Sequence, residues 1–486
     1  MDPSTMAELV ELMQPAAVEL VGADAPIGPD VVIDSRAATP GSLFVALPGE
    51  RVDGHAFAPA AVANGAAGVI GMALTEADVP HILAVDSVEA LSWLARGVVR
   101  RARARGTVSI GVTGSSGKTS TKDLMAQVFE AAGPTVAPVG SQNNEIGVPL
   151  TACRVTRDTR YLVSEMGARG IGHIAWLTSL VGLDIGVCLN VGRAHVGEFG
   201  GMEATALAKS EIVSGLSSDG WAVLNADDPL VAAMAAATQA RIAWFGEREV
   251  PPVGTGGPLA AGALRVTARD VALDARARAS FTLVADDGAA ERVAQVTLGV
   301  IGRHQVSNAL AAAATALAAG LDLDDVAAAL SAAGPRSRWR MELETRADGV
   351  LILNDAYNAN PDSMAVALDT LARLSATSRE THPEARACAV LGDMLELGPE
   401  AAELHRDLGR RAAKAGVAEV IAVGGFAGDV AAGAAAGGVS ARVAARETVA
   451  ASLTLRPGDV VLVKGSRGVG LEKVAAELIA QEGGAS

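Results

Sequence analysis

The sequence predicts an α/β protein of three domains: a small N-terminal α/β domain, a central domain built on a parallel sheet, and a C-terminal Rossmann-like domain. Its 486 residues are enough for about three domains at roughly 100–200 residues each. Short β-branched apolar runs alternate with helical stretches, which is typical of parallel sheets with crossover helices. A Gly/Ser-rich turn also follows one of these runs and opens a helix, as in phosphate-binding loops.

The charge balance argues against a general role in coating nucleic acids. The chain has 40 Lys and Arg residues against 55 Asp and Glu residues, which gives a net charge of −15 at pH 7. A protein that coats DNA or RNA needs a basic surface and often aromatic side chains for base stacking. Aromatic residues make up only 3% of the chain, although 50% of it is hydrophobic. We therefore expect cores built from Ala, Val and Leu, and no nucleic acid polymer as a partner.

The sequence predicts a cytoplasmic protein without a membrane span. No window approaches the roughly 18 consecutive apolar residues of a membrane helix, and the N-terminus lacks the basic residues of a signal peptide. Cys153, Cys188 and Cys388 are far apart and odd in number. This spacing is typical of small core residues in a reducing compartment, not of disulfides or a metal site.

The first domain is expected at residues 1–105. Apolar runs at residues 41–47 and 67–70 predict strands, and the stretches between them are Ala-rich and helical in pattern. The basic run at residues 96–105 is interpreted as a solvated helix end, where cations complement the helix dipole. The alternative interpretation of this run is a phosphate-binding patch.

The second domain is expected at residues 106–335, where strands and helices alternate as in a parallel sheet. Residues 281–285 and 291–298, joined by Asp287-Gly288, predict a β-hairpin, and residues 308–319 predict an Ala-rich helix. The dipeptide Gly334-Pro335 marks the next boundary. The predicted strands are residues 107–112, 161–164, 185–189 and 221–224.

The third domain is expected at residues 336–486, where each strand-like run is again followed by a helical stretch. This alternation predicts a doubly wound α/β domain. The predicted strands are residues 350–353, 387–391, 417–423 and 460–463.

The strongest motif is Gly-Val-Thr-Gly-Ser-Ser-Gly-Lys-Thr-Ser-Thr at residues 111–121. Gly114 and Gly117 permit a tight turn whose N–H groups point at phosphate oxygens, at the start of a helix. Lys118 can reach the β- and γ-phosphates of a nucleotide, and the Thr119 hydroxyl can hold Mg²⁺. The first glycine of the usual phosphate-loop pattern is replaced by Val112. The alternative is a chance Gly-rich turn.

Two further side chains follow predicted strands. Glu165 comes after the strand at 161–164, where a carboxylate can join phosphate oxygens in holding Mg²⁺ if that strand neighbours the loop. His195 follows the strand at 185–189 and is flanked by glycines. Taken singly, such residues are a surface carboxylate and a structural histidine as readily as ligands.

Together these motifs resemble the Mur ligases, the ATP-dependent amide-forming enzymes of peptidoglycan precursor synthesis. The resemblance extends from residues 34–36 to Arg467 and so covers essentially the whole chain. The segments 354–364, 391–398 and 464–467 resemble the members of the family that add D-alanyl-D-alanine. The other motifs, in the family's order, are residues 113–120, 143–147 (Asn-Asn-Glu-Ile-Gly), 164–167 (Ser-Glu-Met-Gly), 190–195, 208–212 (Ala-Lys-Ser-Glu-Ile) and 225–228 (Asn-Ala-Asp-Asp).

The resemblance implies a role for each matching residue. Thr119, Glu165, His195 and Lys209 would hold two Mg²⁺ ions, with Lys209 carbamylated, and with Lys118 they form the expected catalytic set. His304 and Asn308 would contact adenine, while Arg340 and Asp355 would contact phosphate and ribose, although Arg336 and Arg338 compete with Arg340 for that match. The ATP phosphates would be bound by Thr113, Gly114, Ser115, Ser116, Gly117, Lys118, Thr119 and Ser120. The expected substrate-binding residues are Ser35 and Arg36 for the uridine end, Asn143, Asn144 and Glu145 for the muramoyl peptide, and Asn358 and Asn360 for the dipeptide.

The implied reaction joins D-alanyl-D-alanine to the terminal carboxylate of UDP-N-acetylmuramoyl-tripeptide, with ATP as the energy source and a monomer as the expected state. The first domain would then bind the UDP-muramoyl end, the second ATP and the third the dipeptide. The alternatives are a sister ligase that adds a single amino acid, a folate polyglutamating ligase, and a nucleotide-binding scaffold without activity. The sequence leaves open whether the third residue of the tripeptide is lysine or diaminopimelate.

Overall fold

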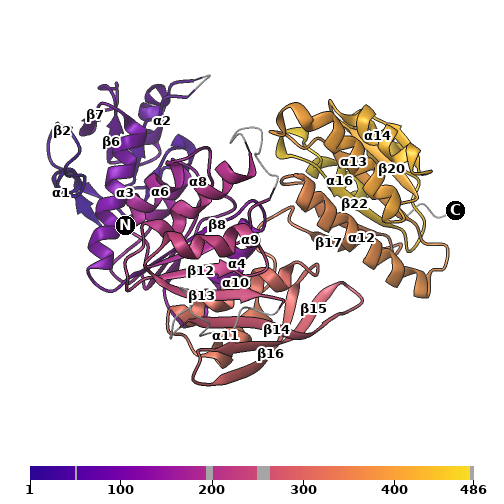
Figure 1. The fold of residues 1–486 in the computed structure, drawn as a ribbon. Coiled ribbons are helices and arrows are strands. Elements are labelled where there is room, and N and C mark those ends of the chain that lie inside the picture. Colours follow the sequence, from indigo (N-terminus) through magenta and orange to yellow (C-terminus); the bar gives the residue numbers. More distant parts are fainter. Residues whose placement is uncertain (50–51, 193–200, 249–262, 482–486) are drawn as a thin grey trace.

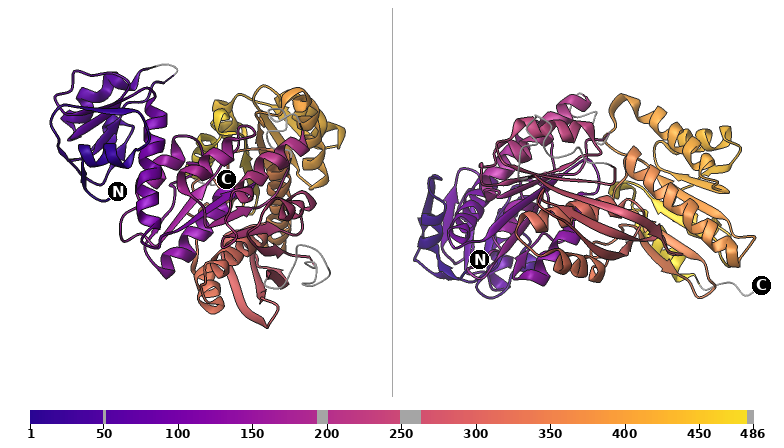
Figure 2. Two further views of the ribbon diagram at one scale, coloured as in Figure 1. Left: turned by 60° about the vertical axis from the view of Figure 1, so that its left-hand side comes forward. Right: turned by 60° about the horizontal axis from the view of Figure 1, so that its bottom comes forward.

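The chain folds into three α/β parts, each built on its own main sheet, and this confirms the predicted fold class. The structure is a computed structural model that describes residues 1–49, 52–192, 201–248 and 263–481. The first and last parts lie on opposite sides of the central part, as Figures 1 and 2 show from different directions. The described part of the chain contains no helix long and apolar enough to cross a membrane.

The first part contains a five-stranded sheet in the order β2-β7-β6-β5-β4, in which only β2 is antiparallel to its neighbour. A two-stranded sheet, β1-β3, lies beside α1. The long helix α3 carries Arg100, Arg101 and Arg103 in its last turn, which confirms the predicted helix end. Arg100 is exposed as expected, but Arg101 and Arg103 are partly buried and pair with Asp2 and Asp184. The elements are β1 (Ser4–Thr5), α1 (Met6–Leu12), β2 (Val18–Val21), β3 (Pro26–Ile27), β4 (Val31–Val32), η1 (Ser35–Ala37), β5 (Leu43–Val45), η2 (Gly54–Phe57), α2 (Ala58–Ala63), β6 (Gly68–Gly71), β7 (His81–Ala84) and α3 (Ser87–Arg103).

The central part is a nine-stranded sheet in the order β16-β15-β14-β13-β12-β11-β8-β10-β9. Strands β9 to β14 run parallel to β8, and β15 and β16 form the predicted antiparallel hairpin at one edge. Its first elements are β8 (Val108–Thr113), α4 (Lys118–Ala132), β9 (Thr135–Val136), α5 (Gly147–Ala152), β10 (Tyr161–Glu165), α6 (His173–Val181), β11 (Ile185–Cys188) and α8 (Met202–Ser214). The rest are β12 (Trp221–Asn225), α9 (Pro229–Ala232), η3 (Ala233–Ala237), β13 (Arg241–Gly246), β14 (Leu264–Leu273), β15 (Arg278–Asp286), β16 (Glu291–Ile301), α10 (Gln305–Ala318) and α11 (Leu323–Ala332).

The last part is a six-stranded sheet in the order β17-β18-β22-β19-β20-β21, parallel except for the edge strand β17. Strand β22 comes last in the chain yet lies in the middle of the sheet, as in doubly wound folds. The elements are β17 (Glu342–Thr345), β18 (Leu351–Asp355), α12 (Pro361–Thr381), β19 (Ala387–Gly392), η4 (Gly398–Glu400), α13 (Ala401–Lys414), β20 (Glu419–Val423), α14 (Ala427–Ala436), β21 (Ser440–Val443), α15 (Arg446–Ser452), β22 (Val460–Lys464), η5 (Arg467–Val469) and α16 (Glu472–Ala480).

The cores are aromatic-poor, as the composition predicts. Helix α10 buries a row of alanines against the central sheet, among them Ala309, Ala312 and Ala316 at 0% exposure. Helices α13 and α14 approach so closely that a Cβ on Gly433 would lie 2.0 Å from the carbonyl oxygen of Arg406. Small residues thus allow short interaxial distances where bulky side chains would hold the helices apart.

The three cysteines are buried and free, which agrees with their predicted role as core residues. Burial raises the pKa of the Cys153 and Cys188 thiols to about 12. Both groups are therefore neutral at physiological pH and inert as nucleophiles.

Asp2 connects the first part to the central one. Its carboxylate accepts a hydrogen bond of 3.0 Å from the backbone N–H of Arg157 in the central part. The guanidinium groups of Arg101 and Arg105, at the end of α3, lie 4.0 and 3.4 Å from the same side chain. The N-terminal residues therefore bridge the two parts at the end of α3.

Candidate active site

The phosphate loop lies between two strands that bring other predicted ligands to the same edge of the sheet. Strand β8 ends at Thr113, and the loop at residues 114–117 leads directly into α4. Glu165, the last residue of β10, pairs with Val112, and Cys188, the last residue of β11, pairs with Thr113. The condition set by the sequence, that the strand carrying Glu165 neighbours the loop, is therefore met. Val112 itself is buried in β8 at 0% exposure, so here the first position of the usual loop pattern is a core position.

The backbone of the loop requires its glycines. Gly117 has φ +80°, and a Cβ there would lie 2.7 Å from Asn308 Oδ1 on α10. A Cβ on Gly114 would lie 2.9 Å from the side chain of Leu189. The two glycines thus allow the loop to turn tightly between β11 and α10.

Asn190 forms hydrogen bonds with the backbone of the phosphate loop. The sequence analysis did not single out this residue individually. Its Oδ1 accepts a 2.9 Å hydrogen bond from the backbone N–H of Ser116, and its carbonyl accepts one of 3.1 Å from Ser115. The Ser115 hydroxyl in turn accepts from the N–H of Gly192 at 2.9 Å. Asn190 is the first residue of the motif at residues 190–195, and this position was the feature of the sequence that could have identified it. His195, at the end of that motif, lies outside the described residues.

Lys118 is the first residue of α4 and faces the cleft. Its Nζ donates a 2.5 Å hydrogen bond back to the carbonyl oxygen of Gly114, so the ammonium lies over the loop. Burial lowers its pKa, while the nearby Glu165 carboxylate opposes that shift.

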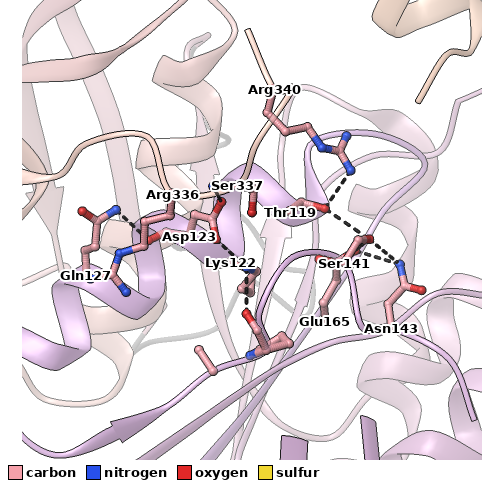
Figure 3. Close-up of polar contacts among 12 residues, drawn as sticks. Thr119, Lys122, Asp123, Gln127, Ser141, Asn143, Glu165, Arg336, Ser337 and Arg340 are labelled. Atoms are coloured by element: carbon pink, nitrogen blue, oxygen red, sulfur yellow. Dashed lines mark hydrogen bonds and ion pairs between the residues drawn. The ribbon is translucent and has the colours of Figure 1, made fainter. Parts of the chain in front are cut away.

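Thr119, Ser141, Asn143 and Glu165 form one hydrogen-bonded cluster (Figure 3). Glu165 is 0% exposed, and its Oε1 accepts from Ser141 Oγ and Asn143 Nδ2, both at 2.8 Å. Its Oε2 is buried and has no hydrogen-bond partner among the described residues. A buried carboxylate oxygen without a donor favours a cation. Ser141 was missed by sequence reasoning, although it lies two residues before the Asn-Asn-Glu motif.

A carboxylate and a hydroxyl are oxygen ligands of the kind that Mg²⁺ prefers. Among the described residues no group of three or more His, Cys, Asp or Glu side chains could hold a metal. Glu165 and Thr119 therefore fit a Mg²⁺ that completes its shell with phosphate oxygens and water, and do not fit an all-protein metal cage.

Helix α4 also holds the segment that leads into the last part of the chain. Gln127 exchanges two 3.0 Å hydrogen bonds with the backbone of Gly334, and Arg336 pairs with Glu130. Asp123 accepts from the N–H of Ser337 at 3.2 Å (Figure 3). This series ends at Arg340, whose Nη2 lies 3.0 Å from Thr119 Oγ1. Of the three competing arginines, Arg340 is therefore the one that faces the phosphate loop. Arg336 is committed to Glu130, and Arg338 is exposed.

Lys209 on α8 lines the same cleft although it is only 3% exposed. Burial, with a smaller contribution from the nearby Lys118, lowers the pKa of its amine to about 7. No hydrogen bond or ion pair within the described part of the chain involves this amine. A neutral lysine amine at physiological pH is a nucleophile that CO₂ can carbamylate.

His304 and Asn308 lie at the start of α10, which begins at Gln305, three residues before the predicted start. The helix begins earlier because Gln305 and Val306 are already buried against the sheet. Asn308 bridges to α4 by accepting from Thr121 Oγ1 at 3.1 Å. Burial lowers the pKa of His304 to about 4, and its Nδ1 has no hydrogen-bond partner within the described ranges. His304 therefore presents a neutral ring to the cleft.

Asp355 ends strand β18 and pairs with Lys464 at the end of the neighbouring strand β22. Lys464 Nζ lies 2.5 Å from Asp355 Oδ2 and donates a 2.8 Å hydrogen bond to the carbonyl oxygen of Asn358. Asp355 Oδ1 accepts from the N–H of Met341 at 3.1 Å, which ties it to the segment carrying Arg340. Lys464 was missed as a site residue, although it begins the Lys-Gly-Ser-Arg motif.

Several predicted substrate residues have structural partners of their own. Asn144 accepts from the N–H of Gly147 at 2.9 Å, and Glu145 pairs with Arg169 at 2.5 Å. Asn360 caps α12 by accepting from the N–H of Ser363 at 2.8 Å, and Asn358 accepts from the N–H of Ala359 at the same distance. Asn144, Asn358 and Asn360 still line the cleft, so each can shape the cavity while supporting its own loop.

The cleft measures about 720 Å³ and joins the central and last parts of the chain. It brings together most predicted residues, including Ser115 to Ser120, Asn143, Glu165, Lys209, His304, Arg340 and Asp355. Ser35 and Arg36 do not line it. They form η1 in the first part, where the largely exposed Arg36 pairs with Asp34 at 2.7 Å.

Three family models match successive parts of the chain. Residues 30–98 match the Mur ligase family catalytic domain, residues 112–316 the Mur ligase middle domain, and residues 339–467 the Mur ligase glutamate ligase domain. The three matched segments follow the same order as the three sheets.

Curated relatives align over the full length. The chain is 43% identical to the UDP-N-acetylmuramoyl-tripeptide–D-alanyl-D-alanine ligase of Mycobacterium tuberculosis, covering 98% of both proteins. It is 35% identical to the ligase of the same name from Escherichia coli, covering 99% of both.

Solved structures give the same result. A crystal structure of MurF from Acinetobacter baumannii has a TM-score of 0.82 at 30% identity, covering 99% of this chain and 100% of that one. The MurF ligase of Thermotoga maritima in complex with ADP has a TM-score of 0.73 at 27% identity, covering 92% and 96%. The resemblance found in the sequence motifs is thereby confirmed.

Proposed function

Because this chain belongs to the Mur ligase family, we propose that it joins D-alanyl-D-alanine to the terminal carboxylate of UDP-N-acetylmuramoyl-tripeptide at the expense of ATP. The products are UDP-N-acetylmuramoyl-pentapeptide, ADP and phosphate, and the reaction is a step of peptidoglycan precursor synthesis. The single observation that carries the proposal is the cleft, in which Lys118, Glu165 and Asn358 line one cavity. Relatives with this activity in their names align over nearly the whole chain.

The chemistry requires activation, because a carboxylate does not react with an amine at neutral pH. In the proposed first step the tripeptide carboxylate attacks the γ-phosphorus of ATP, which gives an acyl phosphate and ADP. The dipeptide amine then attacks the acyl carbon, an amide bond forms, phosphate leaves and the amine loses a proton. The first step brings anions together, so Lys118, Arg340 and the loop N–H groups would offset charge and hold the groups in line.

We infer that Thr119 and Glu165 hold a Mg²⁺ ion, whose chemistry is to neutralise charge between the β- and γ-phosphates. The inference is supported by the partnerless Oε2 of Glu165, 0% exposed at the loop. His195 and a carbamylated Lys209 are proposed for a second Mg²⁺. Carbamylation converts the buried cation of Lys209 into an anionic oxygen ligand, and its lowered pKa favours that conversion.

The remaining roles follow from the lining of the cleft and from the family resemblance. We propose that His304 and Asn308 bind adenine, that Asp355 binds ribose, and that Asn143, Asn144 and Glu145 face the muramoyl peptide. Asn358 and Asn360 would face the dipeptide, and Ser35 and Arg36 would bind the uridine end in the first part. We propose three domains: residues 1–105 for the UDP-muramoyl end, residues 106–335 for ATP and residues 336–486 for the dipeptide.

We further propose that the enzyme acts as a monomer in the cytoplasm. Supporting the cytoplasm, the proposed tripeptide substrate is nucleotide-linked and the three cysteines are free.

The test is a phosphate-release assay with UDP-N-acetylmuramoyl-tripeptide, Mg²⁺ and ATP, comparing D-alanyl-D-alanine with single amino acids. We expect release that depends on the dipeptide, and a loss of about 1,000-fold or more in Lys118→Ala, because transition-state charge then lacks its main side-chain cation. Lys473→Ala, on the exposed face of α16, is the matched control and should retain activity. Release driven by a single amino acid would replace the proposal with a sister ligase.

A further inference from the structure

A groove of about 600 Å³ lies at the end of the central sheet opposite the cleft. Thr107 and Val108 lead into β8 and Asp184 precedes β11, so the groove faces the amino ends of these strands. Helices α3 and α6 pack beside each other here (Figure 1). The volume is in the range of small-molecule sites. Doubly wound folds bind ligands at the carboxyl ends of their strands, which accounts for the cleft and leaves this groove unassigned.

One wall of the groove is formed by three arginines of α3. Arg96, Arg100 and Arg103 are spaced by four and three residues, so they follow one another along one face of the helix. The negative end of a helix dipole attracts cations in the last turn, which contains Arg100 and Arg103. Arg96 lies about two turns before the end of α3, beyond the reach of that attraction. An anion in the groove would offset the repulsion between these like charges.

Only one of the three arginines has a carboxylate partner. Arg103 Nη2 lies 2.5 Å from Asp184 Oδ1, and Arg103 Nε donates to Asp184 Oδ2 at 3.3 Å, so both oxygens of that carboxylate face Arg103. Arg96 and Arg100 are exposed and have no ion-pair partner within the described ranges. The wall therefore presents two positive charges without a counter-charge, in a chain whose net charge is −15.

Two of the guanidinium groups are held in place. Gly182 has φ +54°, and a Cβ there would lie 2.7 Å from Arg103 Nη1, so this glycine leaves room for the Arg103 side chain. The guanidinium of Arg96 lies 5.1 Å from the centroid of the Trp93 ring, whose Nε1 donates to Glu89 Oε1 at 3.1 Å. Restraining the wall in advance lowers the entropy that a ligand must remove on binding.

The floor of the groove is apolar, and hydrogen-bond acceptors lie beside it. Val99, Leu180 and Val181 line the groove and are at most 5% exposed, so a flat ring can cover them. Helix α6 ends at Val181, and the last carbonyl groups of a helix have no partners within it. These carbonyl groups can accept from N–H or hydroxyl groups of a ligand. Cations, an apolar floor and acceptors together match the phosphates, base and sugar of a nucleotide.

We propose that this groove is a second nucleotide site, with a diphosphate at Arg96 and Arg100 and the base on the apolar floor. The ligand class is a nucleoside diphosphate, which adenine and uracil nucleotides share. The site is separate from the proposed function, because none of its residues lines the cleft. Helix α3 belongs to the first part of the chain and Asp184 to the central part, so a bound nucleotide would contact both parts.

Amide hydrogen exchange of the full chain, with and without ligand, tests this proposal. With ADP or UDP at about 5 mM, we expect exchange in residues 96–108 and 179–184 to slow at least about threefold, because bound ligand stabilises its site against opening. The comparison of ADP with UDP identifies the base that the floor prefers. Inorganic pyrophosphate, which has the charges and lacks the ring, should protect these segments less. Vesicles of phosphatidylglycerol form the remaining arm.

A double variant and a matched control identify the arginines. Arg96→Gln combined with Arg100→Gln removes both cations that lack a partner and keeps a good helix former at each position. Protection of the two segments should be lost in this variant, while ADP should still protect the phosphate loop. Arg406→Gln combined with Arg410→Gln removes two arginines of the same spacing from α13, in the last part of the chain, and should keep wild-type protection. Thermal melting of each variant without ligand checks that it is folded.

The cleft and the groove are separated by Lys118→Ala, which should weaken protection of the phosphate loop and leave protection of the groove unchanged. Undiminished protection of the groove in the Arg96 and Arg100 double variant would overturn the proposal. So would a groove that neither nucleotide protects while ADP protects the phosphate loop, and the proposed function would then stand alone. Protection by pyrophosphate equal to that by both nucleotides would remove the base from the site. Protection by the vesicles alone would assign the basic end of α3 to an anionic membrane surface instead.

Discussion

Arg340 donates a 3.0 Å hydrogen bond through Nη2 to Thr119 Oγ1, and so links the entrance of the last part to the first turn of the phosphate-loop helix. Its guanidinium also lies 4.2 Å from the centroid of the Tyr357 ring, which belongs to the motif at residues 354–364. One side chain thus contacts the proposed Mg²⁺ ligand and the proposed dipeptide segment. We therefore expect both the phosphorylation of the tripeptide carboxylate and the attack of the dipeptide amine to depend on Arg340.

Replacing Arg340 with alanine should lower kcat/KM for ATP by about 10- to 100-fold, because a cation that offsets phosphate charge is removed. Arg340→Lys should recover only part of this loss, since an ammonium lacks the planar fork and stacks poorly on Tyr357. Initial rates against ATP concentration measure both effects.

The neighbouring arginines serve as controls for this prediction. Arg338 is exposed, and Arg336 pairs with Glu130 on the surface of α4. Arg338→Ala should therefore retain wild-type kinetics. A larger loss of activity in Arg338→Ala than in Arg340→Ala would mean that Arg338, and not Arg340, contacts the phosphates.

Glu165→Gln should raise the Mg²⁺ concentration needed for half-maximal activity at least tenfold, because a neutral amide is a poor Mg²⁺ ligand. The amide is isosteric and keeps an oxygen for Asn143 and Ser141, so the fold should persist. Without nucleotide the variant should melt at the same temperature as wild type or higher, since a buried charge is removed. Glu477→Gln, on the exposed face of α16, controls for the loss of one carboxylate. An unchanged Mg²⁺ requirement in Glu165→Gln would remove this residue from the metal site.

The sheet edge that carries the site could be predicted because its signals are local. Thr113 and Glu165 each end a β-branched run, and parallel strands bring such ends to one edge. The order of β10, β8 and β11 was not available from periodicity, since it depends on which strands pair. The resemblance to a family supplied the residues from distant parts of the chain that periodicity alone could not bring together.

The sequence could not predict contacts between residues that are far apart in the chain and belong to no motif. Gln127 and Asp123 look like surface residues of an amphipathic helix, yet they hold the backbone of Gly334 and Ser337 and so deliver Arg340 to Thr119. Ser141 carries no motif of its own. Its importance arises only from the 2.8 Å contact with Glu165.

His304 should make the folded state less stable as the pH falls below about 6.5. Its folded-state pKa is lowered to about 4 by burial, while the unfolded chain takes up the proton near the ordinary value of 6.5. The stabilisation is therefore complete above that value and is lost as the pH falls from 6.5 to 4. At pH 5 the loss should be about 1–2 kcal/mol.

The pH dependence of His304→Gln provides the comparison. Urea unfolding at pH 7 and pH 5 should give a smaller difference in unfolding free energy for the variant than for wild type. His382, which lies outside the cleft, supplies the control substitution His382→Gln. Equal pH slopes in wild type and His304→Gln would mean that this ring titrates normally in the folded protein.

Lys209 should form a carbamate whose abundance falls with decreasing pH. Carbamylation needs the neutral amine, and a pKa of about 7 makes roughly half of it neutral at pH 7. Deprotonation of the ammonium releases one proton and carbamate formation from the amine releases a second. At fixed dissolved CO₂, the carbamate signal from ¹³C-labelled bicarbonate should therefore decline by about a hundredfold per pH unit well below pH 7. Lys209→Met should lack the signal and should lose ligation, because the proposed second metal loses an anionic ligand. A carbamate resonance that persists in Lys209→Met, or full ligation by wild type stripped of CO₂, would rule out this modification as part of the site.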